Sequence, residues 1–159
     1  MFQDENRMNE KRKQSERNGH KVVTDEGVTG IRATLSHEMG HKMSNWLQRA
    51  VYGGDFPYKV EKRGYYKIRD YYTDVEVEIQ KKVLKALKMK KGDIGKSVSL
   101  YASTSPAEFF AECFCENMCS SNPRPVAVEF KRQLDAFIKE HNIDNLSTVL
   151  TESARENFA

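Results

Sequence analysis

Two histidines four residues apart give this sequence its clearest chemistry. The segment His37-Glu38-Met39-Gly40-His41 matches the pattern H-E-x-x-H. On a helix, residues at this spacing project from the same face, so both imidazoles can reach one metal ion. Glu38 is turned by about 100° from His37 around the helix axis, which places its carboxylate beside the metal, where it can accept a proton from water. The pattern predicts a zinc site with His37 and His41 as ligands and Glu38 as general base; the alternative is two surface histidines on an amphipathic helix.

A catalytic zinc ion also needs a third protein ligand and an open position for water. The candidates are His20, His141 and the acidic residues. Glu108 and Glu112 stand out because they lie one turn apart on an otherwise apolar helix, where a buried carboxylate needs a partner. Zinc would be the partner of Glu108, and the outer ring N–H of a zinc-bound histidine the partner of Glu112. Glu108 is also the third residue after a helix-capping Ser105-Pro106, so spacing alone fits a ligand and a capping glutamate equally well.

The segment from Tyr101 to Glu112 reads Y-A-S-T-S-P-A-E-F-F-A-E. Together with the H-E-x-x-H pattern, it resembles the gluzincin-type zinc metallopeptidases that include the catalytic domain of anthrax lethal factor. Similar zincin-like domains occur in phage and mobile-element proteins, including head-morphogenesis-type proteins. The resemblance covers two short blocks of the chain.

The resemblance implies specific roles for the matching residues. His37, His41 and Glu108 would bind one zinc ion, Glu38 would be the base, Tyr101 would point at the site, and Glu112 would be an outer-shell partner. The implied function is a zinc-dependent endopeptidase, a hydrolase of the metalloprotease class that acts on a peptide or protein through a zinc-activated water. Tyr101 would help to stabilise the oxyanion. The alternative function is a non-catalytic, zinc-stabilised domain of a phage or mobile-element structural protein; a closed zinc site would favour that alternative.

Four segments have helical patterns that would position these residues. They are residues 31–50, 73–90, 106–119 and 126–141. In the first, apolar residues recur at spacings of three and four, which predicts one stripe facing the core. The stripe comprises Ile31, Leu35, Met39, Met43, Trp46, Leu47 and Ala50. Short strands are expected at residues 20–24 and 96–101, and a hairpin around Gly64.

The predicted fold is mainly α (α+β): a zincin-like domain over residues 20–145, with its active-site helix packed on a second, ligand-bearing helix. Residues 1–19 are expected to form a polar N-terminal arm, either a frayed helix or a mobile segment, and residues 146–159 a C-terminal tail. Residues 53–96 are interpreted as an enlarged insertion. Zincins place a sheet before the H-E-x-x-H helix, and little sequence precedes it here, so we expect a minimal or missing β-sheet.

Composition limits the other functions. No apolar run is long enough to span a bilayer, so we expect no membrane partner. A net charge of +3 does not by itself indicate nucleic-acid binding. Basic residues interleaved with tyrosines across residues 58–72 could bind nucleic acid by stacking, but we interpret them as a solvated loop or a cleft wall.

The number and spacing of the cysteines indicate the redox environment of the protein. Cys113, Cys115 and Cys119 are an odd number within one short segment, which favours reduced thiols and a cytoplasmic setting. Cys115 and Cys119 share a helix face with Glu108 and Glu112 and could bind metal. Packing in the core is the favoured interpretation for them, because free cysteines behave as small apolar residues.

Overall fold

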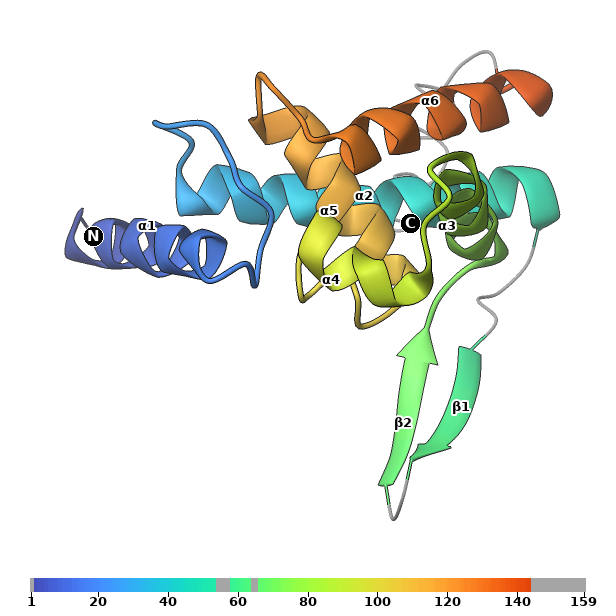
Figure 1. Ribbon diagram of the computed structural model, residues 1–159, viewed down its shortest axis with the longest axis horizontal. Coiled ribbons are helices and arrows are strands. Elements are labelled where there is room, and N and C mark those ends of the chain that lie inside the picture. The colour runs from blue at the N-terminus through green and yellow to red at the C-terminus, as the bar shows by residue number, and fades with distance from the viewer. Residues whose placement is uncertain (1, 54–57, 64–65, 144–159) are drawn as a thin grey trace, which may run out of the picture.

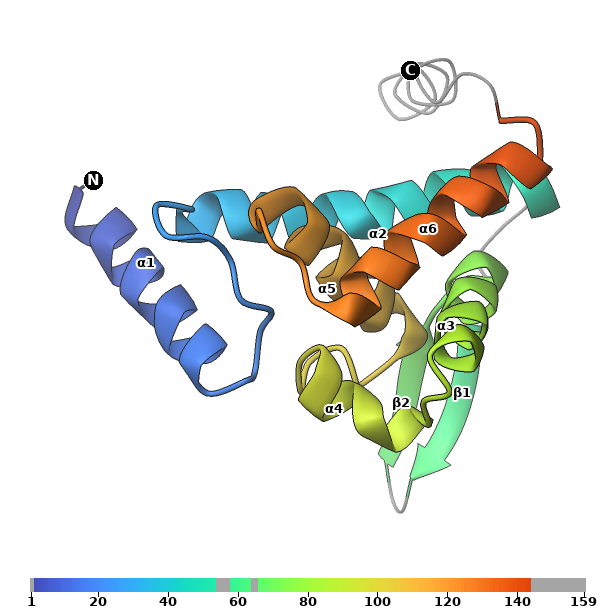
Figure 2. The same ribbon diagram turned by 45° about the horizontal axis from the view of Figure 1, so that its top comes forward.

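The computed structural model describes residues 2–53, 58–63 and 66–143, and over these residues the protein is mainly helical (Figure 1). Its helices are α1 (Phe2–Arg17), α2 (Gly30–Tyr52), α3 (Asp74–Ala86), α4 (Ile94–Ser97), α5 (Pro106–Cys119) and α6 (Pro125–Glu140), with a 3-10 turn at Lys91–Asp93. Helix α5 packs against α2 on one side and against α3 and α6 on the other (Figure 2). Each helix of the four predicted from the sequence is therefore present, with ends shifted by a few residues.

The contact between α2 and α5 depends on small side chains. Gly40 of α2 faces Ala111 and Phe114 of α5, and a Cβ added to Gly40 would lie 2.8 Å from the Ala111 Cα and 3.1 Å from the Phe114 Cβ. Only glycine allows this approach, because any other residue would push the two helices apart. Ala33 on the same side of α2 is completely buried. The glycine of the H-E-x-x-H segment is thus what brings the two helices together.

The expected buried stripe of α2 was largely wrong: of its seven residues only Leu47 is buried, Met43 and Trp46 are half-buried, and Ala50 and the three residues of the first half are exposed. Ile31, Leu35 and Met39 are 43%, 59% and 52% exposed. Apart from Leu47, the buried face carries small and polar residues in their place: Gly30, Ala33, Ser36, His37, Gly40, Ser44 and Gln48. Helix α5 packs on this face of α2 because its small side chains allow the two backbones to approach closely. Larger apolar side chains would prevent that approach.

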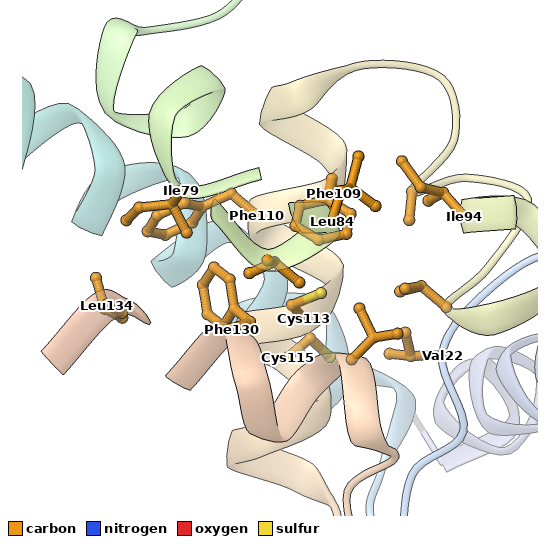
Figure 3. Close-up of a cluster of buried hydrophobic side chains, with 14 of the residues drawn as sticks. Val22, Ile79, Leu84, Ile94, Phe109, Phe110, Cys113, Cys115, Phe130 and Leu134 are labelled. Atoms are coloured by element: carbon orange, nitrogen blue, oxygen red, sulfur yellow. The ribbon is translucent and has the colours of Figure 1, made fainter. Parts of the chain in front are cut away.

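The main core lies between α5 and its neighbours (Figure 3). Phe109 and Phe110 of α5 contact Phe130 of α6 with edge-to-face ring geometry, at centroid distances of 6.4 and 4.8 Å. All three rings are completely buried. At about 1.5–3 kcal/mol for each buried large apolar side chain, this cluster anchors α5 firmly. It thereby fixes the helix that carries Glu108 and Glu112.

The three cysteines are free and buried. Cys113 and Cys115 lie within the apolar cluster (Figure 3). Cys115 Sγ lies 3.3 Å from the Ala33 carbonyl oxygen, and Cys119 Sγ lies 3.3 Å from Ser36 Oγ. Cys115 and Cys119 therefore take part in the packing between α2 and α5. All three cysteines lie in the core, as the favoured interpretation predicted.

Helix α1 is a docked helix, not a free arm. Buried Glu16 accepts hydrogen bonds from Arg12 Nε at 3.0 Å and Thr24 Oγ1 at 2.8 Å. Arg12 also donates to the Val22 carbonyl oxygen at 3.1 Å, and Asn9 accepts a hydrogen bond from the Gly30 backbone. These contacts tie α1 to the following loop and to the start of α2.

Strand β1 (Tyr58–Arg63) and strand β2 (Tyr66–Tyr71) form an antiparallel hairpin with Arg63 opposite Tyr66, which confirms the hairpin predicted around Gly64. It extends away from the helices (Figure 1) and is the only sheet within the described ranges. Residues 20–24 and 96–101 are not strands: Ile94–Ser97 is helical, and residues 20–24 are irregular. The side chains of the tyrosine-rich hairpin and the tail at residues 146–159 lie outside the described part of the chain.

Among the helices of the described ranges, none has both the length and the apolar composition needed to cross a membrane.

Candidate metal centre

Three potential ligand atoms meet where α2 crosses the start of α5. His37 Nε2 lies 3.0 Å from Glu108 Oε2, His41 Nε2 lies 3.5 Å from the same oxygen, and the two histidine nitrogens are 3.2 Å apart. In the part of the chain that the structure describes, His37, His41 and Glu108 are the group that could hold a metal ion. The sequence expectation for these three residues therefore agrees with the geometry.

The spacing of these atoms fits zinc. Ligand atoms about 2.0–2.1 Å from a tetrahedral zinc ion lie about 3.3 Å from one another. The three distances, 3.0, 3.2 and 3.5 Å, bracket that value. Two imidazole nitrogens and one carboxylate oxygen also form a donor set that catalytic zinc sites use.

The hydrogen bonding of His37 also favours a cation. Its Nδ1 lies 2.8 Å from Glu112 Oε1, so Nδ1 carries the proton and, in neutral imidazole, Nε2 presents a lone pair to the centre. Glu108 Oε2 is buried and has no hydrogen-bond partner of acceptable geometry among the described residues. Electron pairs directed at one point repel each other unless a positive charge lies there. A bound metal ion would supply that charge.

Local sequence places Glu108. Ser105 caps α5 by accepting a hydrogen bond from the Glu108 backbone N–H at 3.1 Å, and Pro106 occupies the first turn. The Glu108 carboxylate turns to the two histidines. The serine therefore provides the helix start, which leaves the glutamate side chain free to face the two histidines.

Glu112 is a completely buried carboxylate that organises the outer side of the site. Besides His37, it accepts hydrogen bonds from the Val22 backbone N–H at 2.9 Å and Ser99 Oγ at 2.9 Å, and Lys21 Nζ lies 3.5 Å away. These contacts join the loop after α1, the turn before α5 and the helix α2. They also fix the His37 ring in the tautomer that metal binding requires.

The charged groups of the site shift one another's pKa values. Burial acts to lower the pKa of His37, but its close contacts with the Glu108 and Glu112 carboxylates outweigh it and raise that pKa. Burial acts to raise the pKa of Glu108 and of Glu112, but contact with the histidines, and with Lys21 for Glu112, lowers both. A proton on His37 Nε2 and a metal ion would therefore compete for the same position between His37 and Glu108.

Tyr101 lines the site from the turn before α5. Its ring stacks on the His37 ring at 5.6 Å, and Lys21 Nζ lies 3.2 Å from its centroid, a cation–π contact. Burial and the neighbouring Glu108 carboxylate raise the pKa of Tyr101 to about 12. The phenol therefore stays protonated at neutral pH and can donate a hydrogen bond.

The other candidate residues lie apart from the ligand group. Glu38 is exposed on α2 and is close enough to Tyr101 to contribute to the rise of its pKa. His20 contacts the Tyr101 ring at 5.7 Å, and His141 Nδ1 lies 2.9 Å from the Phe137 carbonyl oxygen at the end of α6. Neither histidine belongs to the ligand group.

Sequence reasoning missed Lys21, Val22 and Ser99, which all contact Glu112. A backbone N–H and a serine carry no motif, so only the three-dimensional structure reveals these contacts.

Comparison with family models, curated proteins and solved structures returned no significant match.

Proposed function

We propose that this protein is a zinc-dependent endopeptidase, with one zinc ion held by His37, His41 and Glu108. The observation that carries the proposal is the convergence of these three ligand atoms, with the Tyr101 ring stacked on that of His37. The resemblance of the two sequence blocks to zincin-like metallopeptidases supports the same assignment. A zincin-like fold is part of the proposal; its support is the packing of the H-E-x-x-H helix on a second, ligand-bearing helix.

Each residue has a role in peptide hydrolysis that its position permits. Bound zinc would lower the pKa of a water molecule to about 7 and polarise the peptide carbonyl. The Glu38 carboxylate accepts the proton of the attacking water and delivers it to the leaving amine. The Tyr101 phenol donates a hydrogen bond to the oxygen that becomes negative in the transition state. Glu112 holds His37 in place throughout.

The openness of the site favours catalysis over a structural role. Structural zinc sites use four protein ligands, whereas catalytic sites use three and leave one position for water or substrate. The described residues supply three. The His41 and Glu108 side chains are 26% and 20% exposed, so solvent reaches the ligands. The alternative function, a non-catalytic zinc-stabilised domain of a phage or mobile-element structural protein, has no comparable observation in its favour.

The test pairs metal analysis with a digest of a peptide library. Four samples are compared by mass spectrometry: the purified protein, the protein with chelator, the chelated protein with zinc restored, and the Glu38→Gln variant with zinc. We expect one zinc ion per chain, and cleavage only in the first and third samples. Stoichiometric zinc without cleavage in any sample would support the non-catalytic alternative. Full activity of Glu38→Gln would exclude Glu38 as the base.

A further inference from the structure

Four buried polar side chains join the start of α3 to α2 just beyond His41. They are Ser44, Gln48, Thr73 and Glu76, each at most 2% exposed. We call this group the α2–α3 clamp. Burying so many polar groups costs free energy unless each finds a partner, so their arrangement calls for a reason beyond packing.

One half of the clamp serves the start of α3. Gln48 Oε1 accepts a hydrogen bond from the Val75 backbone N–H at 3.2 Å, and Gln48 Nε2 donates to Asp74 Oδ2 at 3.1 Å. Thr73 caps the helix by accepting from the Glu76 backbone N–H at 3.2 Å. These contacts satisfy the free N–H groups of a helix start.

The other half reaches the backbone of a proposed metal ligand. Glu76 Oε2 accepts a hydrogen bond from the Thr73 backbone N–H at 2.6 Å, and Glu76 Oε1 lies 2.5 Å from Ser44 Oγ. Ser44 Oγ in turn lies 3.0 Å from the His41 carbonyl oxygen. Ser44 Oγ therefore lies between Glu76 Oε1 and the His41 carbonyl oxygen, and because a hydroxyl has only one proton, Ser44 shares that proton between these two acceptors.

His41 needs such support more than His37 does. The outer nitrogen of His37 is held by Glu112 at 2.8 Å. Within the described residues, the hydrogen bonds of His41 include no such carboxylate on its outer nitrogen; its side-chain contacts are to His37 and Glu108. The position of the His41 ring therefore depends on the position of its backbone.

We infer that Glu76, acting through Ser44, is a positioning residue that holds the second metal ligand, His41, in place. The inference rests on the metal site of the proposed function, and it does not require peptide hydrolysis. It assigns to the segment after the hairpin an indirect role in metal affinity, through the position of His41.

The test compares Ser44→Ala and Glu76→Ala with the matched control Gln48→Ala, which weakens the other half of the clamp. Zinc affinity is measured by competition with a chromophoric chelator, ligand geometry by the visible absorption of bound Co²⁺, and folding by denaturation of the metal-free proteins. We expect the first two variants to lose about 10–100-fold in zinc affinity and to change the Co²⁺ spectrum, as outer-shell changes do. Gln48→Ala should lower stability while retaining wild-type zinc affinity and spectrum.

The variant Glu76→Gln adds a rescue test, because an amide can donate to Ser44 and accept from the Thr73 N–H. We expect near wild-type zinc affinity for it. Wild-type affinity in Ser44→Ala, or an equal loss in Gln48→Ala, would overturn the inference alone. An equal loss in Glu76→Gln and Glu76→Ala would overturn its hydrogen-bonding basis. A wild-type protein that binds no zinc would overturn the proposed function and this inference together.

Discussion

Gly40 and Ala111 bring α2 and α5 so close that a Cβ at position 40 would lie 2.8 Å from the Ala111 Cα. His37 and His41 flank this contact on α2, and Glu108 lies one turn before it on α5. The separation of the two helices at Gly40 therefore sets the distance between the histidines and the carboxylate.

The first prediction is that Gly40→Ala damages both stability and metal binding. The added methyl group meets backbone, which cannot rotate away, so the helices must separate; overpacking of this kind costs about 1–3 kcal/mol. Denaturant unfolding should show that loss in the metal-free protein, and chelator competition should show weaker zinc binding. Gly92→Ala, at a glycine with open space around it, is the control and should not affect zinc binding. Unchanged zinc affinity in Gly40→Ala would mean that the helix separation does not control the site.

The second prediction concerns Glu112. Glu112→Gln removes the negative charge from the partner of His37 Nδ1, so zinc affinity should fall by about 10–100-fold. Glu116→Gln is the matched control, since Glu116 is equally buried on α5 but pairs with Arg124, away from the histidines. It should lower the free energy of unfolding and keep wild-type zinc affinity. Equal losses of zinc affinity in the two variants would contradict the outer-shell role.

The third prediction separates binding from catalysis at Tyr101. Tyr101→Phe keeps the ring that stacks on His37 and contacts Lys21 but removes the donor hydroxyl. If peptide hydrolysis is the function, kcat should fall by about 100–1,000-fold, the scale seen for the loss of one oxyanion donor. KM and zinc affinity should stay close to the wild-type values. A rise in KM with unchanged kcat would assign Tyr101 to substrate binding.

The fourth prediction is thermal. Free zinc at about 100 times its Kd stabilises a folded protein by about 2.7 kcal/mol. For a chain of this size, that corresponds to a rise in Tm of about 5–10 °C. Differential scanning fluorimetry should detect the rise on adding zinc to the chelated protein, and the rise should vanish in Glu108→Ala. A similar response in Glu108→Ala would exclude Glu108 as a ligand.

The fifth prediction uses pH to test the docking of α1. Burial acts to raise the pKa of Glu16, but hydrogen bonds from Arg12, Thr24 and Lys13 outweigh it, and the pKa lies below its ordinary value. A lowered folded-state pKa means that Glu16 contributes stability above its unfolded pKa of about 4.3, and that this contribution disappears as the pH falls through the folded pKa.

Wild type and Glu16→Gln should therefore differ in unfolding free energy by about 1–3 kcal/mol at pH 7, and the difference should shrink below pH 4.3. Urea denaturation of the metal-free proteins at several pH values measures this. A difference that does not change with pH would show that the Glu16 charge plays no part in docking α1.

The sequence predicted the site better than it predicted the surroundings of the site. The spacing of His37 and His41 defines a shared helix face, and Ser105-Pro106 defines the start of α5, so both helices and the common direction of the two histidines could be inferred from local rules. The buried face of α2 could not, because counting apolar residues cannot tell which face a neighbouring helix approaches most closely. Leu35 and Met39 were expected to be buried, yet they are exposed.

Other contacts depend on chain segments that are distant in sequence. Ser44 and Glu76 carry no motif, and their pairing follows from where α3 docks. Residues 96–101 were expected to be extended. Asp93 Oδ2 accepts a hydrogen bond from the Lys90 backbone N–H at the start of the 3-10 turn Lys91–Asp93, and the helix Ile94–Ser97 follows directly from that turn.

The three residues of the ligand group are not synthesised at the same time. His37 and His41 lie early in the chain and Glu108 late, with residues 42–107 between them. During synthesis the histidine pair is complete long before the carboxylate exists, and contacts between such distant segments form late in folding. High-affinity metal capture would then require synthesis to have passed α5, and a product truncated before α5 would lack it even with its H-E-x-x-H segment intact.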